Sequence, residues 1–281
     1  MEKRTISEQQ VDAFAAYLQQ EEHSRGTIEK YLRDVRRFSQ WLKDCALTKE
    51  QVAAWKTHLL QEGYAAVTIN SMLAAVRVFF QWKGLGQCPV KSLRIQRRIF
   101  RESSKELTRE EYRQLLETAE QNGRERLALL LETICSTGIR VSEVPFITME
   151  ALNCGAAEIA LKGKIRTILL PGKLCRKLKK YAKKQKINSG EIFLTRNGNS
   201  LSRKQIWAEL KALCKMTDIE ASKVFPHNLR HLFARVFYNA SKDVAKLADV
   251  LGHSSIETTR IYLISTGREH KAQIEKLKLI N

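Results

Sequence analysis

Apolar residues recur at helical spacing through most of the first 85 residues, and this periodicity restricts the fold more than any other feature of the chain. The same spacing recurs at residues 52–59 and 69–80. The clearest case is a single apolar face formed by Ile28, Tyr31, Leu32, Val35, Phe38 and Leu42. Basic residues stand off that face, so the pattern predicts a helix with one buried stripe and a charged surface.

Helix starts and stops can be placed around these segments. Ser7 to Gln10 and Thr48 to Gln51 each fit a capping box, in which a hydroxyl and an amide satisfy the first backbone N–H groups of a helix. Glycines at 84 and 86, followed by a proline at 89, end the last segment. The first 85 residues therefore predict four helices.

The second part of the chain reads as a larger helical domain with a small sheet inside it. Thr108 to Glu111 fits a third capping box, and a strongly apolar helix around residues 127–134 stops at Gly138. Residues 158–161 and 165–170 have the composition of β-strands and flank a short turn. Residues 192–194 are a third strand-like segment and precede another turn. We expect a mainly α protein, with a small antiparallel β-sheet in its C-terminal helical domain.

A basic segment separates the two helical parts. Residues 91–105 lack helix caps and hold a single acid against six cations, which are Lys91, Arg94, Arg97, Arg98, Arg101 and Lys105. We predict an N-terminal domain at 1–90, a linker at 91–105 and a C-terminal domain at 106–281. The linker is either an ordinary solvated connection or a segment that follows nucleic-acid phosphates.

Net charge is the strongest signal in the composition. The chain has 49 Lys and Arg against 30 Asp and Glu, a net charge of +19, and a pI near 9.8. Residues 1–102 contain 17 basic and 11 acidic side chains, and the remainder contains 32 and 19, so both parts are positive. Residues 162–186 alone hold eleven Lys or Arg and no acid, which favours polyanion contact over a merely solvated face. Nucleic acid is the first partner this indicates, ahead of an anionic membrane or no polyanion at all.

Composition also excludes several classes. With 43% hydrophobic and 28% charged residues, the chain is neither disordered nor fibrous. No stretch approaches 18 consecutive apolar residues and no signal peptide is visible, so we expect a cytoplasmic protein without a membrane span. The six cysteines lie far apart, without the close pairs of a zinc or dithiol site, and no pattern supports a cysteine nucleophile.

Three short segments carry the most specific chemistry. They read TGIRVSE at 137–143, HNLRH at 227–231 and LGHSSIETTRIYL at 251–263. In this order, with a lysine turn between the first two, they resemble the signature of the tyrosine recombinase, or phage integrase, family. The resemblance covers nearly the whole chain. It implies that the N-terminal four helices form a SAM-like core-binding domain and that the C-terminal domain is catalytic.

The residue types suit chemistry on a phosphodiester. Attack on phosphorus concentrates negative charge on the non-bridging oxygens, and arginine supplies a planar cation that does not deprotonate. Arg140 and Arg230 match the two arginines of the family, although Arg140 taken alone could be a buried ion-pair partner of Glu143. His227 and Arg230 are three residues apart, on one face of a helix that begins after Pro226, and offer an acid-base group beside a charge clamp.

The last segment supplies the nucleophile. Tyr262 lies nine residues after His253 and matches the family's attacking tyrosine. Little of a phenol is ionised at neutral pH, so it needs cations and proton acceptors close by. The glycine before His253 predicts a turn that presents the imidazole ring, whereas we expect His231 to have a structural part only.

The resemblance also assigns a lysine and an acid. A lysine in the hairpin turn protonates the leaving 5′ oxygen, and Lys162 is the first choice, with Lys164 as its rival. The turn reads KGKIR, which is shorter than the family pattern between KG and the next basic residue. Glu143 matches the family's acid, which holds the histidine and arginine in place.

By this resemblance the protein cleaves and rejoins double-stranded DNA at specific recombination sites through a 3′-phosphotyrosyl bond, without a cofactor, ATP or a metal ion. It implies a homo-tetramer on DNA, or an assembly with a related recombinase. A stripe of Ile274, Leu277 and Ile280 would pack on a neighbouring protomer or on its own domain. The alternatives are a type IB topoisomerase-like enzyme that religates the same strand, and a DNA-binding or assembly protein that does not cut.

Overall fold

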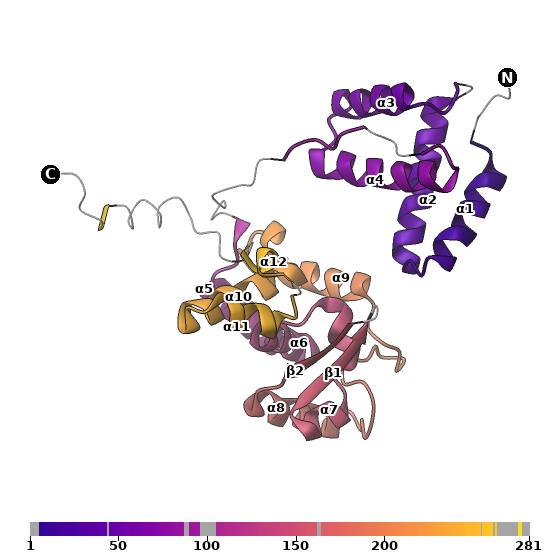
Figure 1. The fold of residues 1–281 in the computed structure, drawn as a ribbon. Helices are drawn as coiled ribbons and strands as arrows, with labels where there is room; N and C mark the ends of the chain where they lie inside the picture. The colour runs from indigo at the N-terminus through magenta and orange to yellow at the C-terminus, as the bar shows by residue number, and fades with distance from the viewer. Residues whose placement is uncertain are drawn as a thin grey trace. The chain divides into compact units, whose positions relative to one another are not determined.

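The computed structural model describes residues 6–43, 45–86, 90–95, 105–161, 164–253, 255–260, 262 and 275–276. The chain folds as two compact units, Met1–Arg97 and Arg98–Asn281, and each unit has its own buried apolar core (Figure 1). In the described part of the chain, every helix is too short or too polar to cross a membrane.

The first unit contains the predicted helical segments, which are α1 (Glu8–Gln20), α2 (Arg25–Leu42), α3 (Lys49–Gln61) and α4 (Ala66–Trp82). Aromatic rings from all four helices fill its core. The ring of Phe14 meets that of Phe79 edge-on at 5.1 Å, and Phe38 lies 4.9 Å from Trp55 between ring centroids. The helical periodicity of the first 85 residues is therefore confirmed as one buried face per helix.

Two of the three predicted capping boxes are complete. The side chains of Ser7 and Gln10 exchange hydrogen bonds with each other's backbone N–H at the start of α1, as do those of Thr108 and Glu111 at the start of α5 (Arg109–Gln121). At the start of α3 only half of the box is present, because Thr48 Oγ1 accepts from the backbone N–H of Gln51 without a recorded return bond.

The start of the predicted linker is held against the first unit. The side-chain amide of Asn70 on α4 donates to the carbonyl of Leu93 at 2.9 Å and accepts from its N–H at 2.7 Å. Lys56 on α3 donates to the Lys91 carbonyl at 2.8 Å. Residues 90–95 are thus fixed by side chains of α3 and α4, while residues 96–104 lie outside the described part.

The second unit is helical apart from one hairpin. After α5 its elements are α6 (Glu125–Thr137), the 3-10 turn η2 (Val141–Phe146), α7 (Met149–Cys154), β1 (Ala156–Leu161), β2 (Lys164–Leu169), α8 (Gly172–Lys184), α9 (Arg203–Cys214), the 3-10 turn η3 (Ala221–Lys223), α10 (Pro226–Ser241), α11 (Val244–Leu251) and α12 (Ile256–Arg260). The predicted apolar helix is α6, which is buried and packs against α5, α8 and α10.

Strands β1 and β2 pair antiparallel in a register that runs from Ala156 opposite Leu169 to Leu161 opposite Lys164. Strand side chains alternate between the two faces of a sheet. On β2 the outward residues Ile165 and Leu169 are 80% and 75% exposed. Arg166 and Ile168 consequently point to the other face, toward the interior of the unit.

The predicted third strand at residues 192–194 is wrong. The segment makes only isolated bridges, from Glu191 to Thr148 and from Leu194 to Ser200. Ile192 and Phe193 are consecutive and both fully buried, which an alternating strand does not allow. The turn that follows does form, because the Gly198 N–H donates to the carbonyl of Thr195 at 3.0 Å.

Candidate active site

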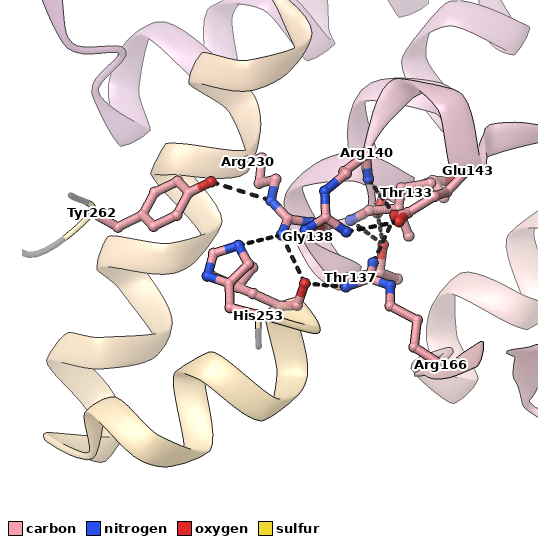
Figure 2. A network of polar contacts seen from close by, with 11 residues as sticks. Thr133, Thr137, Gly138, Arg140, Glu143, Arg166, Arg230, His253 and Tyr262 are labelled. Carbon is pink, nitrogen blue, oxygen red and sulfur yellow. Dashed lines mark hydrogen bonds and ion pairs between the residues drawn. The ribbon is translucent and has the colours of Figure 1, made fainter. Parts of the chain in front are cut away.

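Residues from four separate parts of the sequence meet in one polar cluster of the second unit (Figure 2). They are Arg140 at the start of η2, Arg166 from β2, Arg230 from α10, His253 after α11 and Tyr262 after α12. Glu143 is the carboxylate among them. The cluster therefore depends on the packing of the whole unit rather than on one local motif.

The end of α6 provides a backbone acceptor for the guanidinium of Arg230. Gly138 closes the helix in the left-handed conformation, at φ +65°, which glycine adopts without strain. A Cβ atom there would lie 2.4 Å from the ring of Phe233 on α10. This close approach of α6 and α10 brings the carbonyl of Gly138 to the guanidinium of Arg230, which donates to it.

Arg230 is the centre of the cluster and is only 1% exposed. Pro226 occupies the first turn of α10, and Arg230 follows one turn later on a buried face. Its Nη2 donates to the Leu251 carbonyl at 2.8 Å and lies 3.0 Å from His253 Nε2. Burial lowers the pKa of Arg230 to about 10, so the guanidinium keeps its charge at neutral pH.

The buried carboxylate of Glu143 organises two further arginines. It accepts from the backbone N–H of Arg140 at 2.7 Å and from Nη1 of Arg140 at 2.9 Å. On its other side, Nη2 of Arg166 donates to it at 2.6 Å. The Arg140 side chain stays 41% exposed despite this ion pair, so it can also meet a ligand. The ion pair with Glu143, which the sequence left open as an alternative reading of Arg140, does form, but Arg140 itself is not buried.

His253 stands on the turn that its preceding glycine predicts. Gly252 ends α11 at φ +61°, and a Cβ atom there would lie 2.4 Å from the Arg166 side chain. Burial, and then the charges of Arg230 and the other arginines, lower the pKa of His253 to about 4. The imidazole is thus neutral at physiological pH.

The neighbours of His253 assign its tautomer. Nε2 faces an N–H donor of Arg230 and must accept, so the proton sits on Nδ1. Nδ1 then donates to Thr259 Oγ1, which lies 2.8 Å away in α12. The neutral imidazole of His253 therefore links Arg230 to Thr259 through one accepted and one donated hydrogen bond.

Tyr262 closes the cluster. Its hydroxyl accepts a hydrogen bond from Arg230 Nε at 3.4 Å, and its ring is buried in a small apolar group with Leu247 and Leu251 of α11. The ring of His253 stacks on it at 5.6 Å between centroids and an interplanar angle of 17°. The nucleophile candidate thus has both a fixed cation and an imidazole against it.

Two more histidines of α10 surround the same phenol. The ring of His231 is buried and lies 4.3 Å from the Tyr262 ring, while that of His227 lies 5.9 Å away and is exposed. His227 and His231 also meet edge-on at 4.6 Å. His231 therefore packs directly on Tyr262, and His227 stands at the solvent side of the site.

The structure brings together five of the six residues that the sequence predicted for the site, which are Arg140, His227, Arg230, His253 and Tyr262. The sixth, Lys162, lies outside the described residues, and its rival Lys164 is the first residue of β2. The predicted tail stripe at 274–280 also falls almost wholly outside the described part.

Arg166 is the residue that sequence reasoning missed. Besides its ion pair with Glu143, its Nη1 donates to the Leu251 carbonyl, which Arg230 also uses. Burial lowers the pKa of Arg166, while the charge of Glu143 opposes that shift. The sequence did contain a signal for a buried role of Arg166, because strand alternation places it on the same face as Ile168 and Leu170. A charged residue on an apolar strand face is rarely buried without a partner.

The charges of this group suit an anion. Three guanidinium groups face a single carboxylate, and the imidazole of His253 is neutral, so the described cluster carries excess positive charge. A phosphate group of a nucleic acid has the charge and the acceptor oxygens that arginine forks bind. The site therefore combines a phosphate-binding cluster with a tyrosine hydroxyl inside it.

Comparison with protein families places these residues in a known group. Residues 105–268 match the model described as "Phage integrase family", and residues 11–84 match "Phage integrase, N-terminal SAM-like domain". The first match contains all members of the cluster.

Two individual proteins that the chain resembles are tyrosine recombinases by name. The chain is 33% identical over 184 residues to Tyrosine recombinase XerA of Pyrococcus furiosus, covering 63% of each protein. It is 32% identical over 143 residues to Tyrosine recombinase XerD of Listeria monocytogenes, covering 47% of this chain and 48% of the relative. The matched segments thus span less than two thirds of these relatives.

Solved structures share the fold. XerH site-specific recombinase bound to difH substrate superposes with a TM-score of 0.69 at 20% identity, covering 96% of this chain and 84% of that one. A lambda integrase (75–356) dimer bound to a COC′ core site gives a TM-score of 0.72 at 18% identity, covering 91% and 94%. Since one family model spans the whole cluster and a second spans the N-terminal helices, this chain belongs to the phage integrase family.

Proposed function

We propose that this protein is a site-specific DNA recombinase, which cleaves and rejoins double-stranded DNA through a covalent bond between Tyr262 and a 3′ phosphate. One observation carries the proposal, which is the Tyr262 hydroxyl held on the guanidinium of Arg230 within a cluster of excess positive charge. Family membership and the recombinase names of the relatives support it.

The chemical step is an exchange of phosphate esters. The phenolic oxygen of Tyr262 attacks phosphorus, the bond from phosphorus to the 5′ oxygen breaks, and a 5′-hydroxyl strand leaves. Arg140 and Arg230 stabilise the negative charge that collects on the non-bridging oxygens. The 5′-hydroxyl of a partner duplex then attacks the phosphotyrosine and restores both the DNA bond and the phenol. The ester bond is conserved throughout, so the reaction as proposed needs no ATP or metal ion.

Proton transfer completes the step. The phenolic proton passes to an imidazole beside the ring, and we assign it to His227, because the burial and arginine charges that lower the pKa of His253 make that ring a weak base. We assign the proton donated to the leaving 5′ oxygen to Lys162 in the hairpin turn. In the sequence Lys162 lies between β1 and β2, and β2 supplies Arg166 to the cluster.

We further propose how the chain assembles on DNA. Residues 1–90 act as a core-binding domain and residues 106–281 as the catalytic domain, joined by the basic linker 91–105, and together they clamp a duplex. Exchange between two duplexes requires four strands and hence four protomers, as a homo-tetramer or with a related recombinase. The structures of similar fold in complex with DNA sites support this arrangement. With DNA as the substrate, we place the protein in the cytoplasm.

A nicked suicide substrate tests the proposal. Such a duplex loses a short 5′-hydroxyl strand after attack, so the covalent protein–DNA adduct accumulates and is seen on a denaturing gel. We expect an adduct with the wild type and none with Tyr262→Phe, whose affinity for the same duplex should stay close to the wild-type value, because the cationic cluster around residue 262 is retained.

Two outcomes separate the alternatives. DNA binding without any adduct would mean a non-cutting DNA-binding protein. An adduct that is resealed only onto its own strand, with no transfer to a second labelled duplex, would mean a topoisomerase-like enzyme. Arg230→Ala should reduce adduct formation far more than binding, and equal losses would make Arg230 a docking residue.

A further inference from the structure

Helix α8 presents a row of four cations to solvent, on the face opposite to its buried side. Lys173, Arg176, Lys180 and Lys183 are spaced three, four and three residues apart, which aligns them along one face of the helix. All four are exposed, and among the described residues no ion pair is recorded for any of them. The helix contains no acidic residue, so these like charges weaken it unless an anion lies against them.

Most of the remaining helix surface is engaged, apart from Lys179, which is also exposed and has no ion pair among the described residues. Leu174, Leu178 and Tyr181 are buried in the core of the second unit. At the edge of the helix, Lys177 pairs with Glu132 at 2.5 Å and Lys184 with Glu125 at 2.7 Å, both acids being on α6. The neighbouring acids of α6 are thus engaged by the flanking lysines, and the row of four remains directed outward.

The side chains of this row fit nucleic-acid phosphates better than a membrane surface or a protein interface. A membrane-surface helix needs an apolar face to insert, and the apolar face of α8 is buried in its own unit. Protein interfaces are depleted in lysine and rely on aromatic anchors, and this row has none. A line of flexible point charges, about 15 Å long from the helical rise, fits phosphates contacted without base readout.

We propose that the exposed face of α8 binds the phosphates of duplex DNA, independently of sequence and outside the segment whose phosphate meets Tyr262. The helix packs against α6 and α7, whereas Tyr262 and Arg230 lie with α10, α11 and α12. In Figure 1 α8 lies beside α7, on the side of the hairpin away from α12. The identity of the polyanion rests on the proposed function, while the row itself does not.

Salt dependence of binding tests this surface. We compare the wild type with a variant carrying Lys173→Gln, Arg176→Gln, Lys180→Gln and Lys183→Gln, on a random-sequence duplex of about 40 base pairs, long enough to extend past one catalytic unit. Each lost phosphate contact should lower the slope of log K against log salt by about 0.9, hence by roughly 2 to 4 in total. Affinity at low salt should fall by about ten-fold or more.

A matched variant separates charge from structure. Lys173→Arg, Lys180→Arg and Lys183→Arg with Arg176 retained keeps all four cations and should bind as the wild type does. The glutamine variant should melt no lower than the wild type, because it removes only repulsion. Its rate of adduct formation on a saturating nicked substrate should also be unchanged, since none of the four residues belongs to the cluster.

Failure of this proposal can be told from failure of the proposed function. No adduct with the wild type would overturn the recombinase assignment whatever α8 does. Equal salt slopes for the wild type and the glutamine variant would overturn the α8 surface, even with full catalytic activity. Loss of binding to anionic phospholipid vesicles with unchanged duplex binding would overturn it in favour of a membrane surface.

Discussion

Arg166 sends its two terminal nitrogens in different directions, one to the carboxylate of Glu143 and one to the backbone carbonyl of Leu251. Through Glu143 it fixes Arg140, and through Leu251 it fixes the turn that carries His253. These hydrogen bonds leave it facing protein acceptors rather than solvent. We therefore expect Arg166 to position the other groups of the site rather than to contact the proposed substrate phosphate.

Replacement of Arg166 should separate rate from affinity. In Arg166→Gln the buried carboxylate loses one cationic partner, which costs about 3 to 5 kcal/mol of stability. Adduct formation at saturating DNA should slow by about ten-fold or more, because Arg140 and His253 lose their support. Urea unfolding and single-turnover adduct assays measure the two effects.

The lysine variant provides the control. Arg166→Lys keeps the charge but lacks a fork that reaches two acceptors, so its rate should fall between those of the wild type and Arg166→Gln. DNA affinity should stay close to the wild-type value in both variants. A loss of affinity as large as the loss of rate would instead place Arg166 on the DNA.

His253 should give the protein an acid-sensitive stability. Its folded-state pKa of about 4 lies below the ordinary histidine value of 6.5. Between these values the unfolded chain binds the proton and the folded chain does not, so this contribution is complete above pH 6.5 and is lost as the pH falls toward 4.

A pair of melting curves checks this. The fall in Tm from about pH 7.5 to about pH 5 should be smaller in His253→Gln than in the wild type, because glutamine does not titrate. An identical fall in both proteins would show that His253 is protonated in the folded state over this range.

Site residues that belong to a motif of fixed spacing can be predicted from the sequence. Residues whose role depends on a tertiary contact cannot. Arg140, Arg230, His253 and Tyr262 follow from three short segments and are found together. The role of Arg166 depends on the approach of β2 to the end of α11, which no local pattern encodes. The neutral state of His253 likewise arises from burial beneath arginines supplied by other elements.

Helix ends, rather than helix middles, build the site. Left-handed glycines close both α6 and α11, and the carbonyl at each end accepts from Arg230. A helix C-terminus has carbonyls without intrahelical partners and a partial negative charge, so it suits a buried guanidinium. Gly138 and Gly252 are thus part of the arginine site although neither has a side chain.

Gly252→Ala tests this at one helix end. Its Cβ would lie 2.4 Å from Cδ and 2.6 Å from Nη1 of Arg166, whose guanidinium is held by Glu143 and Leu251. The left-handed backbone adds about 1 to 2 kcal/mol of strain. We expect lower stability together with slower adduct formation.

Gly155→Ala is the matched control, because Gly155 also ends a helix at positive φ but has open space around its Cβ position. It should carry the backbone strain and leave the rate of adduct formation at the wild-type level. Equal rates for the two alanine variants would mean that the contact with Arg166 does not matter for the site.

At the scale of elements the sequence predicted most of the fold. Periodicity and capping pairs located the four helices of the first unit and α5 and α6 of the second, since both signals are local and α-helical hydrogen bonds are local too. The strand predicted at 192–194 was wrong because a short apolar run does not distinguish a strand from a buried irregular segment. The β1–β2 hairpin could be predicted because its two alternating strands and the turn between them are contiguous in the sequence.

The whole molecule consists of two units with separate cores, and each should therefore unfold as its own transition. Phe79→Ala removes a fully buried ring from the first core and should destabilise that unit by about 3 to 5 kcal/mol. Calorimetry should show one transition moving to lower temperature while the other stays in place. A single transition that shifts as a whole would contradict independent units.

Arg230 has five N–H groups, and four of them already have acceptors among the described residues. A phosphate that binds with two oxygens needs two N–H groups, so it must take over at least one of these bonds, and the longest is the one to Tyr262. In the resting protein the phenol then holds an N–H that the proposed substrate phosphate requires. Arrival of the phosphate and release of the nucleophile are then a single exchange of partners on one guanidinium.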